Sequence, residues 1–469
     1  MLIKTSATFI KEFIDSLDET RQELKPNAKL TAIQKTWLGF CLMGILMLNA
    51  VNWAKFERAG LGSYKSSALS WMFHHAKIAW ELLFRASVIT VLKQHEITEG
   101  TLVLDESDRA RSKRTRFIHK AHKQKDKATG GYVNGQTVVL LLLVTETVTF
   151  PVGFAFYMPD PVVSAWKKED DRLKGEGIAK KDRPAEPEKN PDYPNKLEIA
   201  LDLLQSFKNH HSKIKVNSIL ADALYGTADF MDRSSMIFDG IQVISQLRSN
   251  QNSKLRGKRI NLENYFNKTN QGVVTKFSIR GGKRIEGTVS SARLYVDAHG
   301  KKRFVIALKY EGEKDYRYLV ATNMTWRTVD IIQAYTLRWL VEVFFEDWKL
   351  YEGWGQEAKQ LGEDGSSRGL ILSLLFDHCL LLHPEQKACI ENKQPMNTVG
   401  SLLRRLQMEA LLETIADLLS SSTDISEKLK ELANKIKTVF KLMPSGKHMI
   451  GRDLGRLEPT NSLVYRTNG

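Results

Sequence analysis

Cysteine is scarce in this sequence, and the patterns typical of a secreted or disulfide-stabilised chain are missing. Only three of the 469 residues are cysteine, and Cys41, Cys379 and Cys389 form no CxxC pair. A disulfide framework or a cysteine zinc site is therefore not expected, and a reducing compartment fits. The first residues lead into a helical pattern without the apolar stretch of a signal peptide, so we expect a cytoplasmic protein.

Long apolar runs are also rare. Residues 36–54 carry no charged side chain, but they include Asn49 and Asn52, and the segment is short for a bilayer span. We interpret it as a core helix and expect no membrane partner. Apolar residues make up 42% of the chain and charged residues 26%, which are ordinary values for globular proteins. Disorder, collagen and coiled-coil fibres are excluded as descriptions of the whole chain.

Acidic residues are in deficit relative to basic ones. The chain has 69 Lys and Arg against 54 Asp and Glu, a formal net charge of +15 at pH 7. Such an excess favours a polyanionic partner, either nucleic acid or an anionic membrane surface. The charge alone does not distinguish between these two partners.

The hydrophobic pattern divides the chain into three regions. Residues 1–95 show helical spacing, residues 96–360 mix strands with helices, and residues 361–469 are helical again. Within the middle region, residues 166–194 form a charged loop that cannot bury a core, and residues 249–327 form a β-rich insertion. This order predicts an α/β fold in which helices cover a mixed sheet.

Two aspartates follow short apolar strands. Asp105 comes after Leu-Val-Leu, and Asp222 comes after Ser-Ile-Leu-Ala. Carboxylates held at the edge of a buried sheet are what phosphoryl transfer with two magnesium ions requires. The alternative for each aspartate is that it merely begins a turn.

A third acid, Glu342, lies in a predicted helix over residues 328–351. At about 100° per residue, Tyr335, Arg338, Glu342 and Lys349 fall within about 60° on one face of that helix. The other faces are strongly apolar, and a polar stripe on a buried helix is costly unless its groups are paired or bind ions. The alternative to a binding role is an internal salt bridge between Arg338 and Glu342.

The spacing of these four residues resembles a known signature. Tyr335-x2-Arg338-x3-Glu342-x6-Lys349 is similar to the Y-R-E-K signature of bacterial DDE transposases of the insertion-sequence-4 family. The segments around Asp105 and Asp222 resemble the first and second aspartate motifs of that family, in the same order.

The resemblance implies an RNase H-like mixed-sheet catalytic core with a β-rich insertion, flanked by helical N- and C-terminal regions. Asp105, Asp222 and Glu342 would be the catalytic residues and would bind two Mg²⁺ ions, with Mn²⁺ as a substitute. Tyr335, Arg338 and Lys349 would contact DNA phosphates, and Arg248, after a predicted strand, resembles another phosphate-contacting residue. Trp326 is a candidate for stacking on a flipped base, and its alternative role is to pack in the core beside the helix.

The resemblance also implies partners. Residues 1–95 would recognise terminal inverted repeats in double-stranded DNA, and the enzyme would bind target DNA as well. Pairing of two ends implies a homodimer, for which residues 361–469 offer an interface. The expected location is the nucleoid of a bacterial cytoplasm.

A basic segment follows Asp105 directly. Several Lys and Arg side chains close to metal-binding carboxylates would attract DNA. The common alternative is that these charged side chains simply face the solvent. The residues predicted to contact DNA there are Arg109, Arg111, Lys113, Arg114 and Arg116.

The sequence therefore predicts a cut-and-paste DNA transposase that hydrolyses phosphodiesters at the element's ends and then transfers strands. Two alternatives remain. The first is a catalytically silent DNA-binding regulator derived from a transposase, which metal-dependent nicking would exclude. The second is a related two-metal nuclease, which differs from a transposase in making no joined products.

Overall fold

The structure is a computed structural model that describes most of the chain. The described residues are 6–60, 64–111, 117–125, 130–255, 257–279, 283–357, 360–419, 426 and 430. Of the predicted DNA-contacting residues, Lys113, Arg114 and Arg116 lie outside these ranges.

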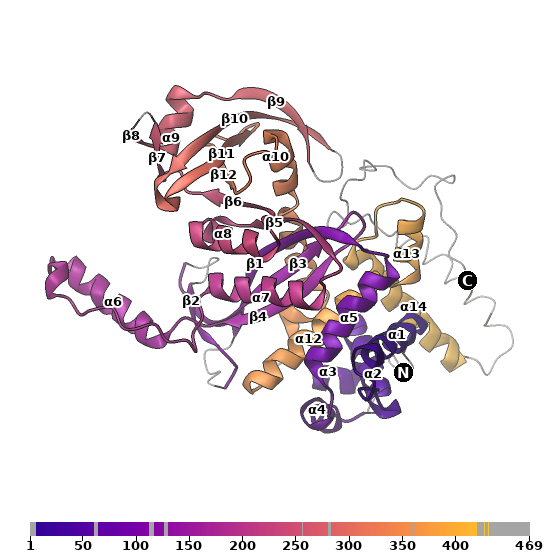
Figure 1. The fold of residues 1–469 in the computed structure, drawn as a ribbon. Helices are drawn as coiled ribbons and strands as arrows, with labels where there is room; N and C mark the ends of the chain where they lie inside the picture. Colours follow the sequence, from indigo (N-terminus) through magenta and orange to yellow (C-terminus); the bar gives the residue numbers. More distant parts are fainter. Residues whose placement is uncertain are drawn as a thin grey trace.

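A mixed β-sheet forms the centre of the molecule (Figure 1). Its core has the order β4-β3-β1-β5-β6, in which β1 pairs antiparallel with β3 and parallel with β5. β5 pairs parallel with β6, and β3 pairs antiparallel with β4. This is the strand order of an RNase H-like fold, and it confirms the predicted fold class. The bounds of these strands are β1 Glu99–Arg111, β3 Tyr132–Val144, β4 Thr149–Tyr157, β5 Lys215–Ala221 and β6 Gln242–Leu247.

The apolar strand β3 shows why helices must cover both faces of the sheet. Residues 138–143 are Val and Leu and are fully buried. Because successive side chains of a strand point to opposite faces, both faces have to be covered. Helix α7 (Lys196–His210) packs on β3 and β4, and its neighbour α8 (Ala228–Ile237) packs on β6. Helices α5 (Trp80–Gln94), α11 (Trp339–Leu350) and α12 (Gly362–Leu381) also contact β4.

The β-rich insertion extends the same sheet. β12 (Arg317–Ala321) pairs antiparallel with β6, so the sheet runs without a break into the insertion at the top of Figure 1. β11 (Lys301–Tyr310) and β10 (Arg284–Val296) follow, giving a 12-stranded sheet. The remaining described strands are β2 His122–Lys125, β7 Asn252–Leu255, β8 Lys258–Asn261 and β9 Val273–Ser278. Short elements near them are α9 Leu262–Asn264, η3 Tyr265–Thr269 and η5 Asp297–His299.

The N-terminal and C-terminal helices pack against each other. Helix α12 contacts α1, α2, α4 and α5, and α14 contacts α2. The segment 36–54, predicted as a core helix, is largely α2, whose middle is buried. No single described helix is long and apolar enough to cross a membrane, although the bent pair α12 and α13 passes by length and composition. Bounds are α1 Thr8–Leu24, α2 Ala32–Leu48, α3 Trp53–Ala59, α4 Ser66–His75, α13 Pro384–Glu391 and α14 Val399–Leu419.

Two elements differ from the prediction. The helix expected over 328–351 is broken into α10 (Thr328–Thr336) and α11, with Leu337 and Arg338 in a turn between them. The Thr336 hydroxyl donates to the carbonyl of Gln333, a local bond that competes with the helix ladder, and the backbone bonds that follow span three residues.

The charged loop contains the helix α6 (Pro161–Gly175), which has no buried residue and extends away from the sheet in Figure 1. Asp160 caps this helix by accepting from the backbone N–H groups of Val162 and Val163. Arg172 forms ion pairs with Glu169 and Glu176 on the same helix. Capping and such pairs stabilise a helix that is exposed all round, so the absence of a core did not prevent helix formation.

Candidate active site

Two adjacent strands position the aspartates. Leu104 of β1 is paired with Ala221 of β5 in the parallel register, so Asp105, the next residue of β1, lies beside Asp222, the first residue after β5. Asp105 is buried within β1, whereas Asp222 begins the loop after β5 and is half-buried. The sheet thereby brings together two carboxylates that lie far apart in the sequence. Asp222 follows the end of a strand as predicted, but the prediction that Asp105 ends its strand was wrong, because β1 continues through it to Arg111.

The loop that begins with Asp222 is fixed at both ends. The Asp222 carboxylate accepts from the N–H of Leu224 at 2.8 Å and caps the turn η2 (Ala223–Tyr225). The Ser245 hydroxyl donates to the Asp222 carbonyl at 2.5 Å. At the other end, a Cβ on Gly226 would lie 2.2 Å from the backbone oxygen of Gln246, so only glycine allows this close approach.

A histidine of the insertion also holds this loop. His299 Nε2 lies 3.0 Å from the Gly226 carbonyl, and His299 Nδ1 accepts from Arg303 Nε at 3.0 Å. Since Nδ1 is the acceptor, Nε2 carries the proton and donates to Gly226. Arg303 is itself paired with Asp232 at 2.7 Å. The insertion therefore contributes to the position of the second aspartate loop.

The guanidinium of Arg338 lies between the carboxylates of Glu342 and Asp105. Arg338 Nη1 donates to Asp105 Oδ2 at 2.9 Å and lies 3.6 Å from Glu342 Oε1. The Glu342 side chain is 44% exposed, whereas that of Asp105 is 10% exposed. The predicted salt bridge between Arg338 and Glu342 is present, but it forms part of a larger group that includes Asp105.

The electrostatics of this group follow from burial. Burial raises the pKa of Asp105 to about 7, against the opposing effects of Arg338 and the Glu106 N–H, and the nearby charges of Asp222 and Glu106 raise it further. Burial lowers the pKa of Arg338, but Tyr335 and the carboxylates of Asp105, Glu342 and Asp222 outweigh it and leave that pKa raised. The three acids thus share one electrostatic environment, centred on a single cation.

Carboxylate oxygens are the ligands that Mg²⁺ prefers, so the donor chemistry of Asp105, Asp222 and Glu342 suits this ion. The buried Asp105 also needs a cation to stay ionised near neutral pH. Among the described residues, no three His, Cys, Asp or Glu side chains are already arranged as a metal-binding group. The guanidinium of Arg338 supplies the positive charge between Asp105 and Glu342.

The other signature residues lie on the same helices. The Tyr335 hydroxyl donates to the Ala221 carbonyl at 3.3 Å, directly before Asp222, and its ring is buried. Lys349 is half-buried, with its ammonium 5.9 Å from the centre of the Phe345 ring. Arg248 is exposed just past the end of β6. Trp326 packs partly buried against the hydrophobic core, in keeping with the alternative role predicted for it.

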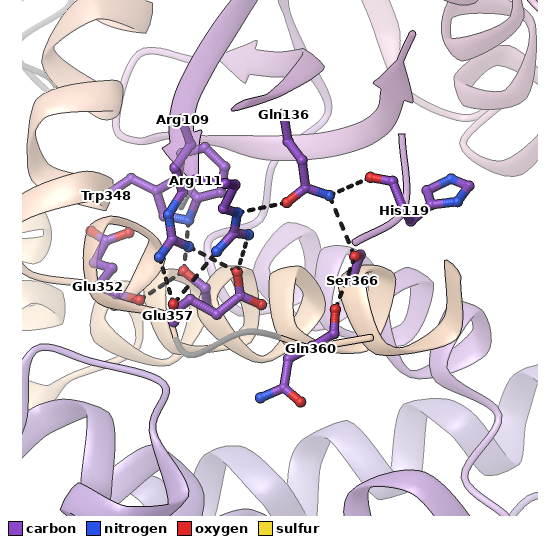
Figure 2. A network of polar contacts seen from close by, with 10 residues as sticks. Arg109, Arg111, His119, Gln136, Trp348, Glu352, Glu357, Gln360 and Ser366 are labelled. Carbon is purple, nitrogen blue, oxygen red and sulfur yellow. Dashed lines mark hydrogen bonds and ion pairs between the residues drawn. The ribbon is translucent and has the colours of Figure 1, made fainter. Parts of the chain in front are cut away.

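Arg109 and Arg111 do not lie on an open basic surface. Their guanidinium groups bind the Glu357 carboxylate at 2.8 and 2.7 Å, with side chains only 10% and 5% exposed (Figure 2). Both also lie over the ring of Trp354. The predicted DNA contact therefore finds no support in their geometry, because their charge is directed at an internal carboxylate.

Several residues at this site were not predicted. The Tyr225 hydroxyl donates to Glu106 at 3.2 Å, and Lys196 forms an ion pair with the same carboxylate at 2.6 Å. Tyr225 belongs to the Ala-Leu-Tyr-Gly segment after Asp222, which was a usable signal. Nothing in the sequence links Lys196 or Glu357 to the site, because their partners are distant along the chain.

Two known protein families match parts of the chain. Residues 34–261 match the family described as DDE superfamily endonuclease, a range that contains Asp105 and Asp222. Residues 189–362 match the family described as Transposase DDE domain, a range that contains Asp222 and Glu342. No curated protein matches the chain. Together with the RNase H-like sheet, the two family matches support a DDE transposase.

Proposed function

We propose that the protein is a DNA transposase of the insertion-sequence-4 family, which moves an insertion sequence by cut-and-paste transposition. The observation that carries this proposal is the group formed by Asp105, Arg338 and Glu342, with Asp222 at the end of the strand next to Asp105. The reaction is phosphodiester hydrolysis at the element's inverted-repeat ends, followed by strand transfer to target DNA.

Asp105, Asp222 and Glu342 would hold two Mg²⁺ ions, and Mn²⁺ would substitute. When bound, the ions would stabilise the charge that develops on the attacking and leaving oxygens. The chain's own part is to fix the carboxylates. Asp105 is held by rigid strand backbone, and Asp222 by the bonds of Ser245 and His299 to its loop. Such positioning is the main contribution that a protein makes to phosphoryl transfer.

Arg338 has two roles in this proposal. In the free protein it neutralises Asp105 and lies near Glu342. With metal and DNA bound, its guanidinium would turn to a phosphate, for which its fork of donors is suited. Tyr335, Lys349 and Arg248 would contact the DNA backbone near the cleaved end, and the net charge of +15 supports a polyanionic partner.

The proposed partners are the terminal inverted repeats and target DNA. The protein would act on paired ends as a homodimer, in the nucleoid of a bacterial cytoplasm. The described N-terminal helices α1–α5 would contribute to recognition of the ends.

The test uses the gene's own flanking DNA, end-labelled on each strand, with purified protein and Mg²⁺. Products are resolved on denaturing gels beside Glu342→Gln, which keeps the side-chain shape but removes the charge. We expect defined cuts and joined products from the wild type alone, and similar DNA binding by both proteins. Binding without cuts by the wild type would favour a silent regulator, and cuts without joined products would favour a nuclease.

A further inference from the structure

A buried network of charged residues lies further along β1 from Asp105. Arg109 Nη1 and Arg111 Nη2 both donate to Glu357 Oε2, and Arg109 Nη2 donates to the Glu357 carbonyl at 2.6 Å. Arg111 Nε also donates to Gln136 on β3, whose amide donates to the His119 carbonyl (Figure 2). The network therefore joins two strands of the sheet to the segment that follows α11.

The arginines stand on the same strand as the first aspartate. Asp105, Arg109 and Arg111 are separated by even numbers of residues along β1, so their side chains project from the same face. Whatever binds the two arginines is thus placed relative to Asp105 by one continuous strand.

Stacked aromatic rings connect the arginines to α11. The guanidinium carbons of Arg109 and Arg111 lie 5.0 and 5.4 Å from the centre of the Trp354 ring. That ring stacks on Trp348 at 4.8 Å with an interplanar angle of 3°, and Trp348 stacks on Phe344 at 5.6 Å. Phe344 and Trp348 are one turn apart on α11, on the side away from Glu342. The rings therefore restrict rotation of α11 about its axis.

We infer that Arg109, Arg111 and Glu357 form a positioning network that fixes α11, and with it Glu342, relative to Asp105 on β1. This inference rests on the proposed function, because Asp105 and Glu342 are two of the proposed metal-binding carboxylates. The network would keep them at the separation that metal binding requires. Glu357 is the central positioning residue, since both guanidinium groups bind its carboxylate.

The ion pairs of this network are expected to persist at neutral pH. Burial lowers the pKa of Arg109 to about 10, and Glu357 opposes this effect, so the guanidinium stays charged at neutral pH. Removing one partner of a buried ion pair leaves an uncompensated charge, which strongly perturbs the surrounding structure. The network can be perturbed in a second way, because a Cβ on Gly369 would lie 2.0 Å from Glu357 Oε1.

Two variants and a control test the inference in the full-length protein. Glu357→Gln removes the central charge, and Gly369→Ala displaces the carboxylate while all charges remain. Asp170→Asn is the control, since it removes the charge of another arginine–carboxylate pair, that with Arg183 at 2.8 Å, in the more exposed segment of helix α6. Mn²⁺ binding is measured without DNA from the EPR signal of free Mn²⁺, together with thermal unfolding and the affinity for end DNA.

We expect Mn²⁺ affinity to fall about 10- to 100-fold in Glu357→Gln, as is typical when a residue supporting metal ligands is removed. It should fall in the same direction in Gly369→Ala and stay at the wild-type level in Asp170→Asn. DNA affinity should be unchanged in all three variants, and the cleavage kcat should fall with the Mn²⁺ affinity. A general loss of stability would instead lower DNA affinity together with Mn²⁺ affinity and kcat.

Wild-type Mn²⁺ affinity in folded Glu357→Gln and Gly369→Ala would overturn the inference while leaving the proposed function intact. If Glu357→Gln does not fold, Gly369→Ala alone decides. If the wild type itself binds no Mn²⁺, the proposed function fails, which is a distinguishable result.

Discussion

The strongest consequence of the site's electrostatics is that Asp105 destabilises the metal-free protein near neutral pH. Its ordinary pKa is 3.8, and burial raises the folded-state pKa to about 7. A difference of roughly three units corresponds to about 4 kcal/mol of unfolding free energy. Because the folded state holds this proton more tightly, its contribution is fully present below pH 3.8 and is lost as the pH rises through 7.

Asp105→Asn isolates this effect, because asparagine has nearly the same shape and never ionises. Unfolding free energies are measured by urea titration in EDTA between pH 5 and 8 for both proteins. Relative to the variant, the wild type should lose roughly 3 kcal/mol across this range, the part of the shift that falls above pH 5. Arg338 is present in both proteins, so the difference reports on Asp105 alone.

Metal provides the matching control. Mg²⁺ at 100 times its Kd should stabilise the wild type by about 2.7 kcal/mol, since a ligand that binds only the folded state adds its binding free energy. Asp105→Asn should gain much less. A difference between wild type and variant that stays constant from pH 5 to 8 would refute the reasoning, because it would mean that Asp105 ionises with an ordinary pKa.

The remaining predictions concern the second aspartate loop and the DNA surface. His299→Ala removes the donor to Gly226 and should lower the urea-derived unfolding free energy by about 1–3 kcal/mol, the usual penalty for an unpaired buried acceptor. His299→Gln keeps a donor and should recover part of that loss, and equal losses in the two variants would contradict the bond's role. Arg248→Gln should weaken binding to all DNA sequences and reduce the log–log salt slope by about 1. An unchanged slope would remove Arg248 from the DNA surface.

Much of this site could be predicted because its residues follow local rules. Asp105 and Asp222 each follow a short apolar run, and the parallel register of β1 and β5 places the two residues side by side. The continuation of β1 past Asp105 to Arg111 was not predicted. Glu342 and Arg338 were predicted from their spacing, because residues four apart lie on the same face of a helix. The two side chains are close in the structure, although α11 begins only at Trp339. The mixed sheet covered by helices followed from the order of strands and helices, whereas its RNase H-like form was predicted from the family resemblance.

What could not be predicted depends on contacts between distant parts of the chain. Arg109 and Arg111 belong to a dense basic segment, and a sequence gives the same charge pattern whether an arginine faces DNA or a buried carboxylate. Their partner Glu357 lies more than 240 residues away along the chain, so no local sequence pattern indicates this ion pair. Likewise, the break between α10 and α11 coincides with a hydroxyl bond of Thr336 and with backbone bonds that span three residues, which apolar periodicity does not detect.

The most direct test of the central claim locates the metal site chemically. Fe²⁺ replaces Mg²⁺ in the purified protein, and ascorbate with peroxide then generates radicals that cut the polypeptide near the bound ion. The account predicts fragments that end close to residues 105, 222 and 342, suppressed by excess Mg²⁺ and much reduced in Glu342→Gln. Cuts elsewhere in the chain, or the same cuts in Glu342→Gln as in the wild type, would contradict the assignment of Asp105, Asp222 and Glu342 as the metal-binding carboxylates.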